Sequence, residues 1–490
     1  MNGSERLSQR RRKAILAICC MSLLIVAMDN TIVNVALPSI HRELKASLSG
    51  LQWTVDAYTI VLASLLMLAG STGDRLGRRR TFQTGLVVFA VGSLCCSLAP
   101  TLGWLVAARA LQAVGGSMLN PVAMSIITNV FTDPRERGRA IGAWGATVGV
   151  SLALGPIVGG ALTDGIGWRA IFWINVPIAL AAVVLTALFV PESRAQRPRR
   201  IDPFGQALVI VALASLTYAI IEGPRAGWGS LQTIGLFALS ILAVATLIPY
   251  ELRRREPLIE PRFFRSPPFS GATLIAVSAF AGFSGFLFLN TLYLQNVRGY
   301  SALDAGLCTL PMAVLAGCLA PLSGRLVGGR GPRPALALGG ICMFAAPLLL
   351  TSLSRTTPLG LLLGVYAVYG IGFGAINPPI TFTAVSGMPD SQAGVAAAVA
   401  STSRQVGQTL GVAVAGSILG SAAAGAAGAQ LAHASHPAWW FIAGCGGAVL
   451  ALGAASTGAW ARRTARRAAE RLEAEIPARS LEPLTYADTA

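Results

Sequence analysis

The sequence predicts an all-α membrane protein, with two bundles of six helices and two further helices between them. Of its 490 residues, 54% are hydrophobic and only 12% are charged, whereas a soluble chain carries about 25% charged residues. The apolar residues gather in runs of about 20, the length that crosses a bilayer as a helix. Short breaks rich in Pro, Gly and Arg separate these runs.

Fourteen apolar runs are long enough to be membrane spans, and an even number of spans places both termini on one side of the membrane. The expected spans are residues 14–37, 51–72, 82–100, 102–125, 140–162, 169–190, 204–222, 231–250, 269–291, 304–324, 334–353, 357–381, 395–420 and 437–460. The first run follows a basic segment, as in a signal peptide. It continues to Pro38 without an Ala-x-Ala site, so we expect an uncleaved span.

The distribution of the basic residues predicts the orientation. The net charge of +17 would suggest a nucleic-acid partner for a soluble protein. Here most Lys and Arg residues fall in the segments that share a side with the termini. The opposite side holds only Arg42, Lys45, Arg169, Arg225, Arg298 and Arg355. Cytoplasmic loops carry the excess of Lys and Arg, so we expect cytoplasmic termini, a multi-pass protein of the bacterial cytoplasmic membrane and no nucleic-acid partner.

Weak internal repetition divides the chain. The loops GSTGDRLGRRR and LSGRLVGGRGPRP occupy the same place in two pairs of spans and share a Gly, Arg-Leu and basic pattern. Duplicated bundles are a recurring transporter design. The expected domains are 1–200, a six-helix bundle; 201–252, a two-helix insert; 253–461, a second six-helix bundle; and 462–490, a basic cytoplasmic tail. The tail is either a helix on anionic headgroups or a regulatory segment.

Three ionisable residues lie inside apolar runs: Asp29, Asp56 and Arg109. A charge at the centre of a membrane helix costs about 2.5–3.5 kcal/mol on insertion scales, so such residues indicate a functional site. With a helix rise of about 1.5 Å per residue, all three lie about 8–14 Å below the outer surface. Two carboxylates in one dry site cannot both ionise cheaply, so one is expected to hold a proton. Arg109 stays charged and favours an ionised partner.

The three residues are therefore predicted to form a proton-coupling site, although each has a structural alternative. Asp29 could be a hydrogen-bonded acid that serves Asn30, Thr31 or Asn34. Asp56 could lie at the membrane interface, and Arg109 could bind backbone carbonyls. Arg404 could snorkel to the inner face or pair with polar groups across a cavity.

Aromatic and polar residues in several spans are candidates for a substrate cavity, although each alone could equally serve packing. With Arg404, they are Trp53, Tyr58, Gln112, Asn290, Tyr293, Tyr366, Asn377 and Gln408.

Small residues dominate span five. Gly145 and Gly149, and then Gly155 and Gly159, lie four residues apart, a spacing that lets helices approach closely. Pro156 is expected to bend the helix. Span five is therefore either a generic packing helix or a hinge or seal.

Several classes of chemistry have no basis in the sequence. The eight cysteines form no CxxC pair, so neither a metal site nor a disulfide framework is indicated. There is no phosphate-binding loop of the Walker type and no nucleophile triad. We therefore expect no enzyme activity, no cofactor and no ATP-driven transport.

The loop at residues 70–79, GSTGDRLGRR, is similar to the cytoplasmic motif G-x-L-a-D-r-x-G-r-k of the major facilitator superfamily, with Thr72 and Gly73 as departures. The chain resembles the fourteen-span drug:proton antiporters of that superfamily along nearly its whole length. This resemblance implies that Asp74 caps a helix of the opposite half and that its basic neighbours latch an outward-open state. The matching residues are Gly70, Asp74, Arg75, Gly77, Arg78 and Arg79.

Three further segments carry the resemblance. Residues 109–116, RALQAVGG, are similar to the R-x-x-Q-G-x-G motif linked to proton coupling, with Ala113 in place of a glycine. Residues 155–160, GPIVGG, are similar to the end of the antiporter motif that distinguishes exporters, with Ser151 in place of its upstream glycine. Residues 24–38 are similar to a signature of the fourteen-span branch. The antiporter motif residues are Gly155, Pro156, Gly159 and Gly160.

The expected function is proton-coupled export of amphipathic drugs or antibiotics by alternating access, with the proton gradient as the energy source and a monomer as the working unit. One alternative is a dedicated exporter of a single natural product. A second is a membrane sensor or scaffold that transports nothing.

Overall fold

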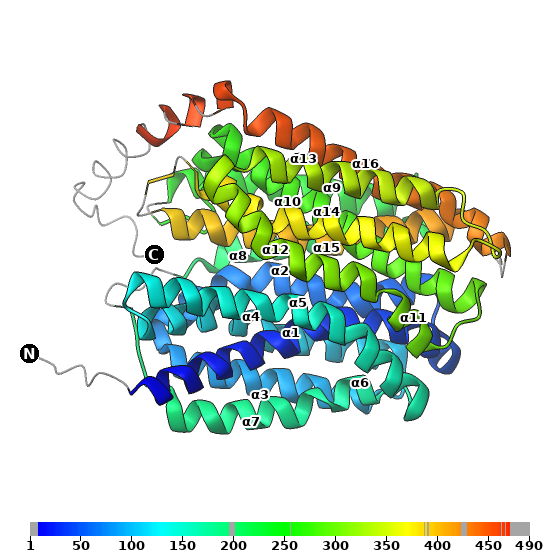
Figure 1. Cartoon of the computed structure of the whole chain (residues 1–490), viewed down its shortest axis with the longest axis horizontal. Helices are drawn as coiled ribbons and strands as arrows, with labels where there is room; N and C mark the ends of the chain where they lie inside the picture. Colours follow the sequence, from blue (N-terminus) through cyan, green and yellow to red (C-terminus); the bar gives the residue numbers. More distant parts are fainter. Residues whose placement is uncertain are drawn as a thin grey trace, which may run out of the picture.

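The computed structural model describes residues 8–195, 201–254, 256–386, 388–389, 392–422, 429–461, 463–465 and 467–470. All regular structure within these ranges is helical. Long helices run roughly side by side through the molecule (Figure 1). The expected domain boundary at residue 200 and most of the expected tail, 462–490, lie outside the described residues; residues 463–465 and 467–470 are helical.

The first half of the chain contains α1 (Gln9–Leu44), α2 (Leu48–Leu76), α3 (Arg78–Ser97), α4 (Leu102–Val130), α5 (Pro134–Gly165), α6 (Ala170–Trp173), α7 (Asn175–Phe189), α8 (Pro203–Ala226) and α9 (Leu231–Arg253). The second half contains η1 (Pro261–Arg265), α10 (Pro267–Leu292), η2 (Tyr293–Val297), α11 (Ala302–Cys308), α12 (Leu310–Arg330), α13 (Arg333–Leu350), α14 (Leu359–Val385), α15 (Ala393–Ala422) and α16 (Ala429–Ser456).

Twelve helices in the described ranges are long and apolar enough to cross a membrane. The sequence predicted fourteen spans, and α3 and α15 fall outside this set of twelve. The first three residues of α3 are arginines, and the middle of α15 carries Ser, Thr, Gln and Arg404. These residues lower the mean hydropathy of both helices, although each is 20 residues or longer.

Local sequence explains where several helices begin. The side chains of Ser47, Thr101 and Asp133 accept hydrogen bonds from backbone N–H groups in the first turns of α2, α4 and α5. Such N-caps satisfy donors that have no partner inside the helix. Gly77, between α2 and α3, has a φ of 111°, which a residue with a side chain rarely adopts.

The helices pack in two sets that follow chain order. In the first set, α1 packs on α5, and α4 packs on α2 and α3; in the second, α10 packs on α15, α12 on α14, and α13 on α16. Figure 1 shows the two sets as the blue-to-cyan and the green-to-red halves of the molecule.

The inserted helix α8 lies along the seam between the two sets, because it packs on both α2 and α15 as well as on α9. Gln206 of α8 donates a hydrogen bond of 2.5 Å to the Ser64 carbonyl oxygen of α2. On the other side, Ser417 of α15 donates to the Ile220 carbonyl oxygen of α8. The insert therefore touches both sets.

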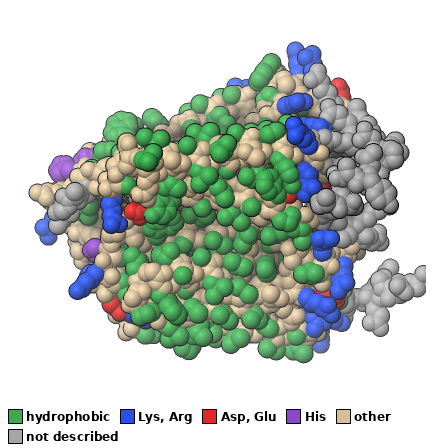
Figure 2. All heavy atoms as spheres, turned by 180° about the vertical axis from the view of Figure 1, so that it is seen from behind, with side chains coloured by type: hydrophobic (Ala, Val, Ile, Leu, Met, Phe, Trp, Pro, Cys, Tyr) green, Lys and Arg blue, Asp and Glu red, His purple; other side chains and the backbone are tan. Residues whose placement is uncertain are grey.

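The two ends of the molecule differ in charge. The start of α1 and the described C-terminal residues lie at the same end of the molecule, here called the terminal end (Figure 1). Basic side chains gather at this end, and a band of hydrophobic side chains covers the middle (Figure 2). This is the pattern expected of a membrane protein whose basic loops share one side.

The two sets meet closely at the end opposite the termini. Asp164, near the end of α5, accepts hydrogen bonds from the N–H groups of Ala302 (3.2 Å) and Leu303 (2.8 Å) at the start of α11. Gln295 donates to the Val35 carbonyl oxygen at 2.8 Å. Toward the terminal end, several glycines of the same helices have no close neighbour. A Cβ placed on any of five glycines of α5 and α12 would meet no atom within 4 Å: Gly138, Gly142, Gly145, Gly328 and Gly329.

Candidate functional site

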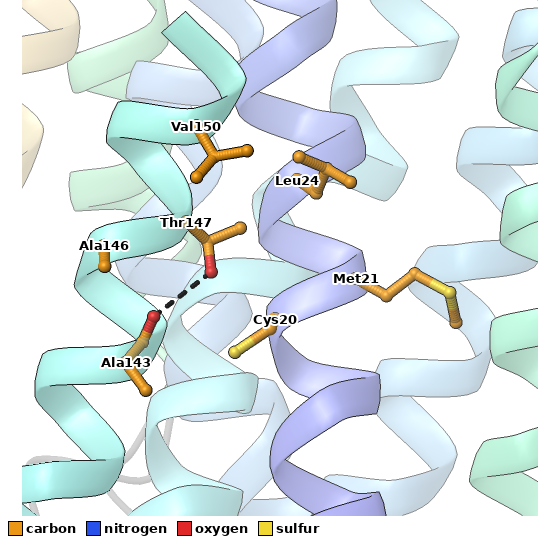
Figure 3. Close-up of a pocket in the computed structure, with 7 residues that line it drawn as sticks. All are labelled: Cys20, Met21, Leu24, Ala143, Ala146, Thr147 and Val150. Carbon is orange, nitrogen blue, oxygen red and sulfur yellow. Dashed lines mark hydrogen bonds between the residues drawn. The ribbon is translucent and has the colours of Figure 1, made fainter. Parts of the chain in front are cut away.

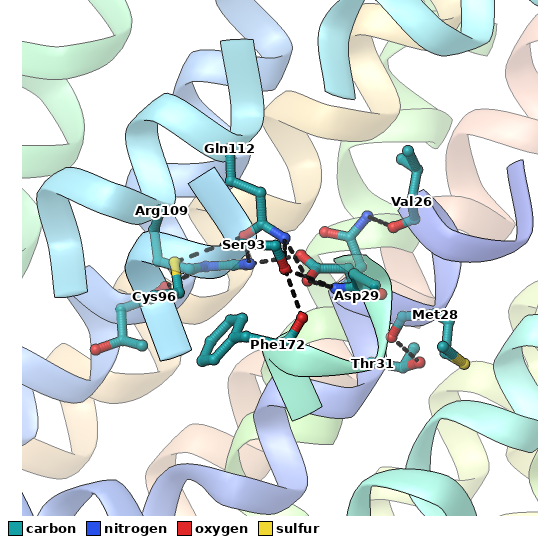
Figure 4. A network of polar contacts seen from close by, with 12 residues as sticks. Val26, Met28, Asp29, Thr31, Ser93, Cys96, Arg109, Gln112 and Phe172 are labelled. Carbon is teal, nitrogen blue, oxygen red and sulfur yellow. Dashed lines mark hydrogen bonds and ion pairs between the residues drawn. The ribbon is translucent and has the colours of Figure 1, made fainter. Parts of the chain in front are cut away.

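Asp29 of α1 and Arg109 of α4 form a buried ion pair. The Arg109 Nη1 donates to Asp29 Oδ2 at 2.5 Å, and the two residues are 1% and 0% exposed. Figure 4 shows both side chains pointing toward one another between their helices. Two charges removed from water in this way are tolerated only when further hydrogen bonds satisfy them.

Two amides complete the contacts of the Asp29 carboxylate. Its Oδ1 accepts hydrogen bonds from Gln112 Nε2 (2.9 Å) and Asn175 Nδ2 (3.2 Å). Both amides also donate to Ser93 Oγ, at 3.3 and 3.1 Å, and Ser93 in turn donates to the Phe172 carbonyl oxygen at 2.9 Å. Donors from α4 and α7 therefore satisfy both oxygens of the carboxylate.

Close contact between α3 and α4 makes this network possible. Arg109 and Gln112 are three residues apart, so they share one face of α4. A Cβ placed on Gly92 of α3 would lie 2.5 Å from the Gln112 Cα, and a Cβ on Gly115 of α4 would collide with the Phe89 backbone nitrogen. These two glycines let α3 approach near enough for Ser93 to reach both amides.

The rest of the Arg109 guanidinium is also engaged. Its Nε donates to the Thr54 carbonyl oxygen of α2 at 3.2 Å, and its Nη1 donates to Gln112 Oε1 at 2.7 Å. Its carbon lies 4.3 Å from the Tyr58 ring centroid and 5.7 Å from that of Phe172. Aromatic faces attract a cation at these distances. Tyr58 and Gln112, proposed from sequence as cavity residues, thus contact the ion pair.

Asp56 is separate from the pair, although it belongs to the same helix as Thr54. It is 0% exposed. Its Oδ1 accepts a hydrogen bond of 3.4 Å from Thr59, which is linked to Thr409 of α15 at 2.9 Å. Its Oδ2 has no hydrogen-bond partner. The structure therefore joins two of the three predicted residues and places the third at the contact between α2 and α15.

The antiporter motif forms a tight contact, here called the glycine contact, made by Gly155, Gly159 and Gly160 of α5 with α1 and α11. A Cβ on Gly155 would collide with Thr31 Oγ1, and one on Gly159 would lie 2.6 Å from Ile32 Cγ1. A Cβ on Gly160 would lie 2.5 Å from the Leu303 Cα of α11. From the other side, a Cβ on Gly306 would collide with the carbonyl oxygen of Pro156.

The loop motif at 70–79 is engaged within its own half. Asp74 Oδ1 accepts two hydrogen bonds from Arg78, at 3.2 and 3.0 Å. The resemblance implied a cap on the opposite half, but in this structure the carboxylate is held by its own loop. Arg75 is exposed and Arg79 is partly exposed, while a Cβ on Gly70 would lie 3.6 Å from Pro121 Cβ.

The other proposed cavity residues fall in several places. Trp53 donates to Glu222 at 3.0 Å and its ring lies 5.4 Å from that of Tyr218, so it contacts α8. Tyr366 donates to Asn290, and Tyr293 donates to the Ser354 carbonyl oxygen at 2.7 Å. The three remaining candidates, Asn377, Arg404 and Gln408, belong to the second half and are partly exposed.

A shallow apolar cavity of about 270 Å³ lies between α1 and α5, on the terminal-end side of the glycine contact. Figure 3 shows its lining side chains, Cys20, Met21, Leu24, Ala143, Ala146, Thr147 and Val150. The Thr147 hydroxyl donates to the Ala143 carbonyl oxygen at 3.3 Å, which leaves an almost wholly apolar surface.

Sequence reasoning missed Ser93 and Asn175 in the network. It also missed Glu192, which accepts hydrogen bonds from the N–H groups of Arg79 (3.1 Å) and Arg80 (3.3 Å) at the start of α3. Asn175 offered a signal, because an amide inside the apolar run WRAIFWINVP has to find a partner. Ser93 offered none, since a small hydroxyl in a span often bonds to its own helix.

The sequence pattern of the Major Facilitator Superfamily matches residues 19–412. The chain belongs to the major facilitator superfamily. It is therefore a transporter of that superfamily and not an enzyme, and it is a multi-pass protein of the cell membrane.

Relatives of this superfamily member are named for drug resistance. The multidrug resistance protein Stp of Mycobacterium tuberculosis is 37% identical over 81% of this chain and 74% of its own length. The tetracenomycin C resistance and export protein of Streptomyces glaucescens is 37% identical over 82% and 74%. The puromycin resistance protein of Streptomyces alboniger is 35% identical over 86% and 84%.

Solved structures of the superfamily share the fold. A D-xylose–proton symporter superposes with a TM-score of 0.64 at 17% identity, over 90% of this chain and 97% of that chain. A peptide transporter solved with sulfate gives 0.65 at 16% identity, over 94% and 95%. At this identity the likeness concerns the fold alone.

Proposed function

We propose that this chain exports amphipathic drugs or antibiotics across the cytoplasmic membrane in exchange for protons, by alternating access. The observation that carries the proposal is the buried pair of Asp29 and Arg109. It places a group that can gain or lose a proton inside the membrane, beside a cation that favours the loss. Its relatives, named for drug and antibiotic resistance, support the export of drugs.

The proposed topology has fourteen spans with both termini in the cytoplasm. α3 and α15 would cross together with the twelve more apolar helices, since each packs along helices of that set. The basic residues gathered at the terminal end support a cytoplasmic position for that end. The end closed by α5 and α11 would then face outward, and this conformation would open inward.

The proposed cycle links the charge of Asp29 to the glycine contact. Thr31 and Ile32, two and three residues beyond Asp29 on α1, are the residues against which Gly155 and Gly159 pack. A proton on Asp29 would remove the charge that Arg109, Gln112 and Asn175 hold in place. α1 would then be free to shift, and the outer contact of α5 with α11 could open.

The direction of coupling follows from this arrangement. In the proposed cycle, Asp29 pairs with Arg109 as a carboxylate once its proton has left toward the cytoplasm. Substrate would bind to this inward-open form. Outside, Asp29 would take up a proton as the substrate leaves. One charge crossing 100 mV supplies about 2.3 kcal/mol, so each proton could drive a substantial gradient.

Other residues have supporting roles in the proposal. Asp56 would be either a second proton carrier or a site for a cationic substrate. The loop around Asp74 would re-pair with the second half when the outside opens. We propose a monomer as the working unit, with the proton gradient as its energy source and no cofactor.

A second candidate function is the export of one natural product. It is favoured by relatives whose names each mention a single antibiotic, such as tetracenomycin C and puromycin. A resistance panel in a strain stripped of its own exporters would separate the two. Resistance to several unrelated drugs supports the multidrug exporter, and resistance to one class supports the dedicated one.

Purified protein in liposomes would test the proposed exchange. With ethidium as the transported dye, an imposed proton gradient should move dye against its concentration, and a proton ionophore should stop it. Protein that moves dye only down its gradient, at the same rate with and without the proton gradient, would disprove the exchange.

A further inference from the structure

Arg404 of α15 is a second intramembrane arginine with a different environment. Its Nη2 donates to Thr381 Oγ1 of α14, and its Nε is buried without a hydrogen-bond partner. Arg109, by contrast, has a carboxylate, an amide and a backbone carbonyl as partners. A guanidinium has five N–H donors, so the single hydrogen bond to Thr381 leaves most of the Arg404 donors available for a ligand.

No acidic side chain among the described residues pairs with Arg404. The helices that pack most extensively on α15 are α2, α8, α10, α14 and α16. Three of them, α10, α14 and α16, carry no Asp or Glu. The acids of the other two are Asp56, Asp74 and Glu222, and these contact Thr59, Arg78 and Trp53. Among the described residues, Arg404 therefore has no acidic side chain as a counter-charge.

Exposure separates Arg404 from Asp56, another ionisable residue inside a span that has no ion-pair partner among the described residues. Asp56 is 0% exposed and is enclosed where α2 meets α15. Arg404 retains partly exposed surface. Of these two residues, Arg404 alone keeps exposed surface.

The neighbouring amide adds a second polar group. Gln408 lies four residues after Arg404, so the two side chains share one face of α15 about 5–6 Å apart. The Gln408 Oε1 is buried and has no hydrogen-bond partner. This face of the helix therefore offers a cation and, one turn further along, a hydrogen-bond acceptor.

We propose that Arg404 binds an anionic group of the transported molecule, and that Gln408 accepts a hydrogen bond from a hydroxyl or amino group one helical turn away. The inference rests on the proposed function and assigns to its cavity a subsite for amphipathic anions, such as aromatic carboxylates and phenolates, beside the uncharged and cationic drugs that the other tests use. A guanidinium binds such groups through two parallel N–H···O bonds.

The membrane potential is consistent with this substrate class. An anion that leaves the cell and a proton that enters it move charge in the same direction. A potential that is negative inside drives both movements.

A matched pair of probes tests the proposal directly. Pyrenebutyrate and pyrenebutyramide differ only in the charge of the carboxyl group, and their fluorescence reports binding to purified full-length protein. Wild-type protein should bind the carboxylate about tenfold more tightly than the amide, the effect of one charge-assisted hydrogen-bond pair. Equal affinity of wild-type protein for the two probes would overturn the proposal, with no variant required.

Variants then locate the preference. R404Q should bind both probes equally, with the affinity for the amide unchanged, and R404K should retain part of the preference. R330Q, which removes an exposed arginine at the end of α12, is the matched control and should behave as wild type. A preference that survives intact in R404Q would also overturn the proposal.

The result is distinguishable from a failure of the proposed function. Proton-driven dye transport without a preference for the carboxylate would refute only the anion site. A preference that depends on Arg404, in protein that shows no proton-driven transport, would support the anion site and refute the exchange.

Discussion

Asp29 and Arg109 form an ion pair whose side chains are 0% and 1% exposed. Thr31, two residues beyond Asp29 on α1, packs against Gly155 of α5, where a Cβ would collide with the Thr31 hydroxyl oxygen. The proposed proton-binding group and the contact that closes the outer end therefore lie within one turn of the same helix. This adjacency is the physical basis proposed for coupling.

Asp29→Asn should abolish proton-driven export, because an amide of the same shape carries no exchangeable charge. The variant leaves Arg109 unpaired, so stability should also fall, by about 3–5 kcal/mol if the site cannot rearrange. Flux in liposomes with a matched amount of folded protein measures the first effect. Asp304→Asn, at an exposed acid, should transport normally. Full proton-driven flux in Asp29→Asn would remove this residue from the mechanism.

Removing both charges should be less damaging to stability than removing one. Arg109→Gln strands a buried carboxylate, whereas Asp29→Asn with Arg109→Gln leaves two neutral amides. Thermal unfolding in detergent should rank the double variant above each single variant, with an interaction energy of about 0.5–3 kcal/mol. The double variant should still transport nothing against a gradient. Additive losses of stability would show that the pair is not coupled.

Gly160→Ala should loosen the outer end, because the added Cβ would lie 2.5 Å from the Leu303 Cα and 2.6 Å from the Ala302 carbonyl oxygen. Cys308 of α11 is buried at 9% exposure and can report on this change. In a variant that keeps Cys308 as its only cysteine, labelling by an impermeant maleimide should rise. Gly142→Ala, whose Cβ would meet open space, is the control. Equal labelling in both variants would contradict the assigned role of the glycine contact.

Asp164→Asn should favour the outward-open form, because the carboxylate accepts the first N–H groups of α11 across the two halves. An acid at a helix N-terminus contributes about 0.3–1 kcal/mol, so the ratio of closed to open protein should fall about twofold to fivefold. Spin labels on α5 and α11 would measure that ratio as distance populations. Unchanged populations would show that the contact contributes nothing to closure.

The sequence predicted the fold class well, because apolar length and charge distribution obey strong membrane constraints. It predicted α3 and α15 as spans, although their Arg, Ser, Thr and Gln residues leave both helices outside the twelve candidate spans of the described residues. Both are nevertheless helices buried among others, since polar side chains such as Thr409 find partners on neighbouring helices.

The site was predicted in part. Helix depth placed Asp29, Asp56 and Arg109 at one level, but depth does not give the face on which a side chain lies. Asp56 faces α15, a helix about 350 residues further along the chain, and no local pattern contains that contact. The caps made by Asp164 and Glu192 escaped notice for a related reason, because each binds the backbone of a distant helix.

Proton release on substrate binding tests the central claim most directly. Purified protein in weakly buffered detergent solution, mixed with ethidium across a series of pH values, should release about one proton per dye bound where Asp29 is protonated beforehand. Asp29→Asn should bind dye and release none. Wild-type protein that binds dye without releasing protons at any pH, or equal release from Asp29→Asn, would contradict the account.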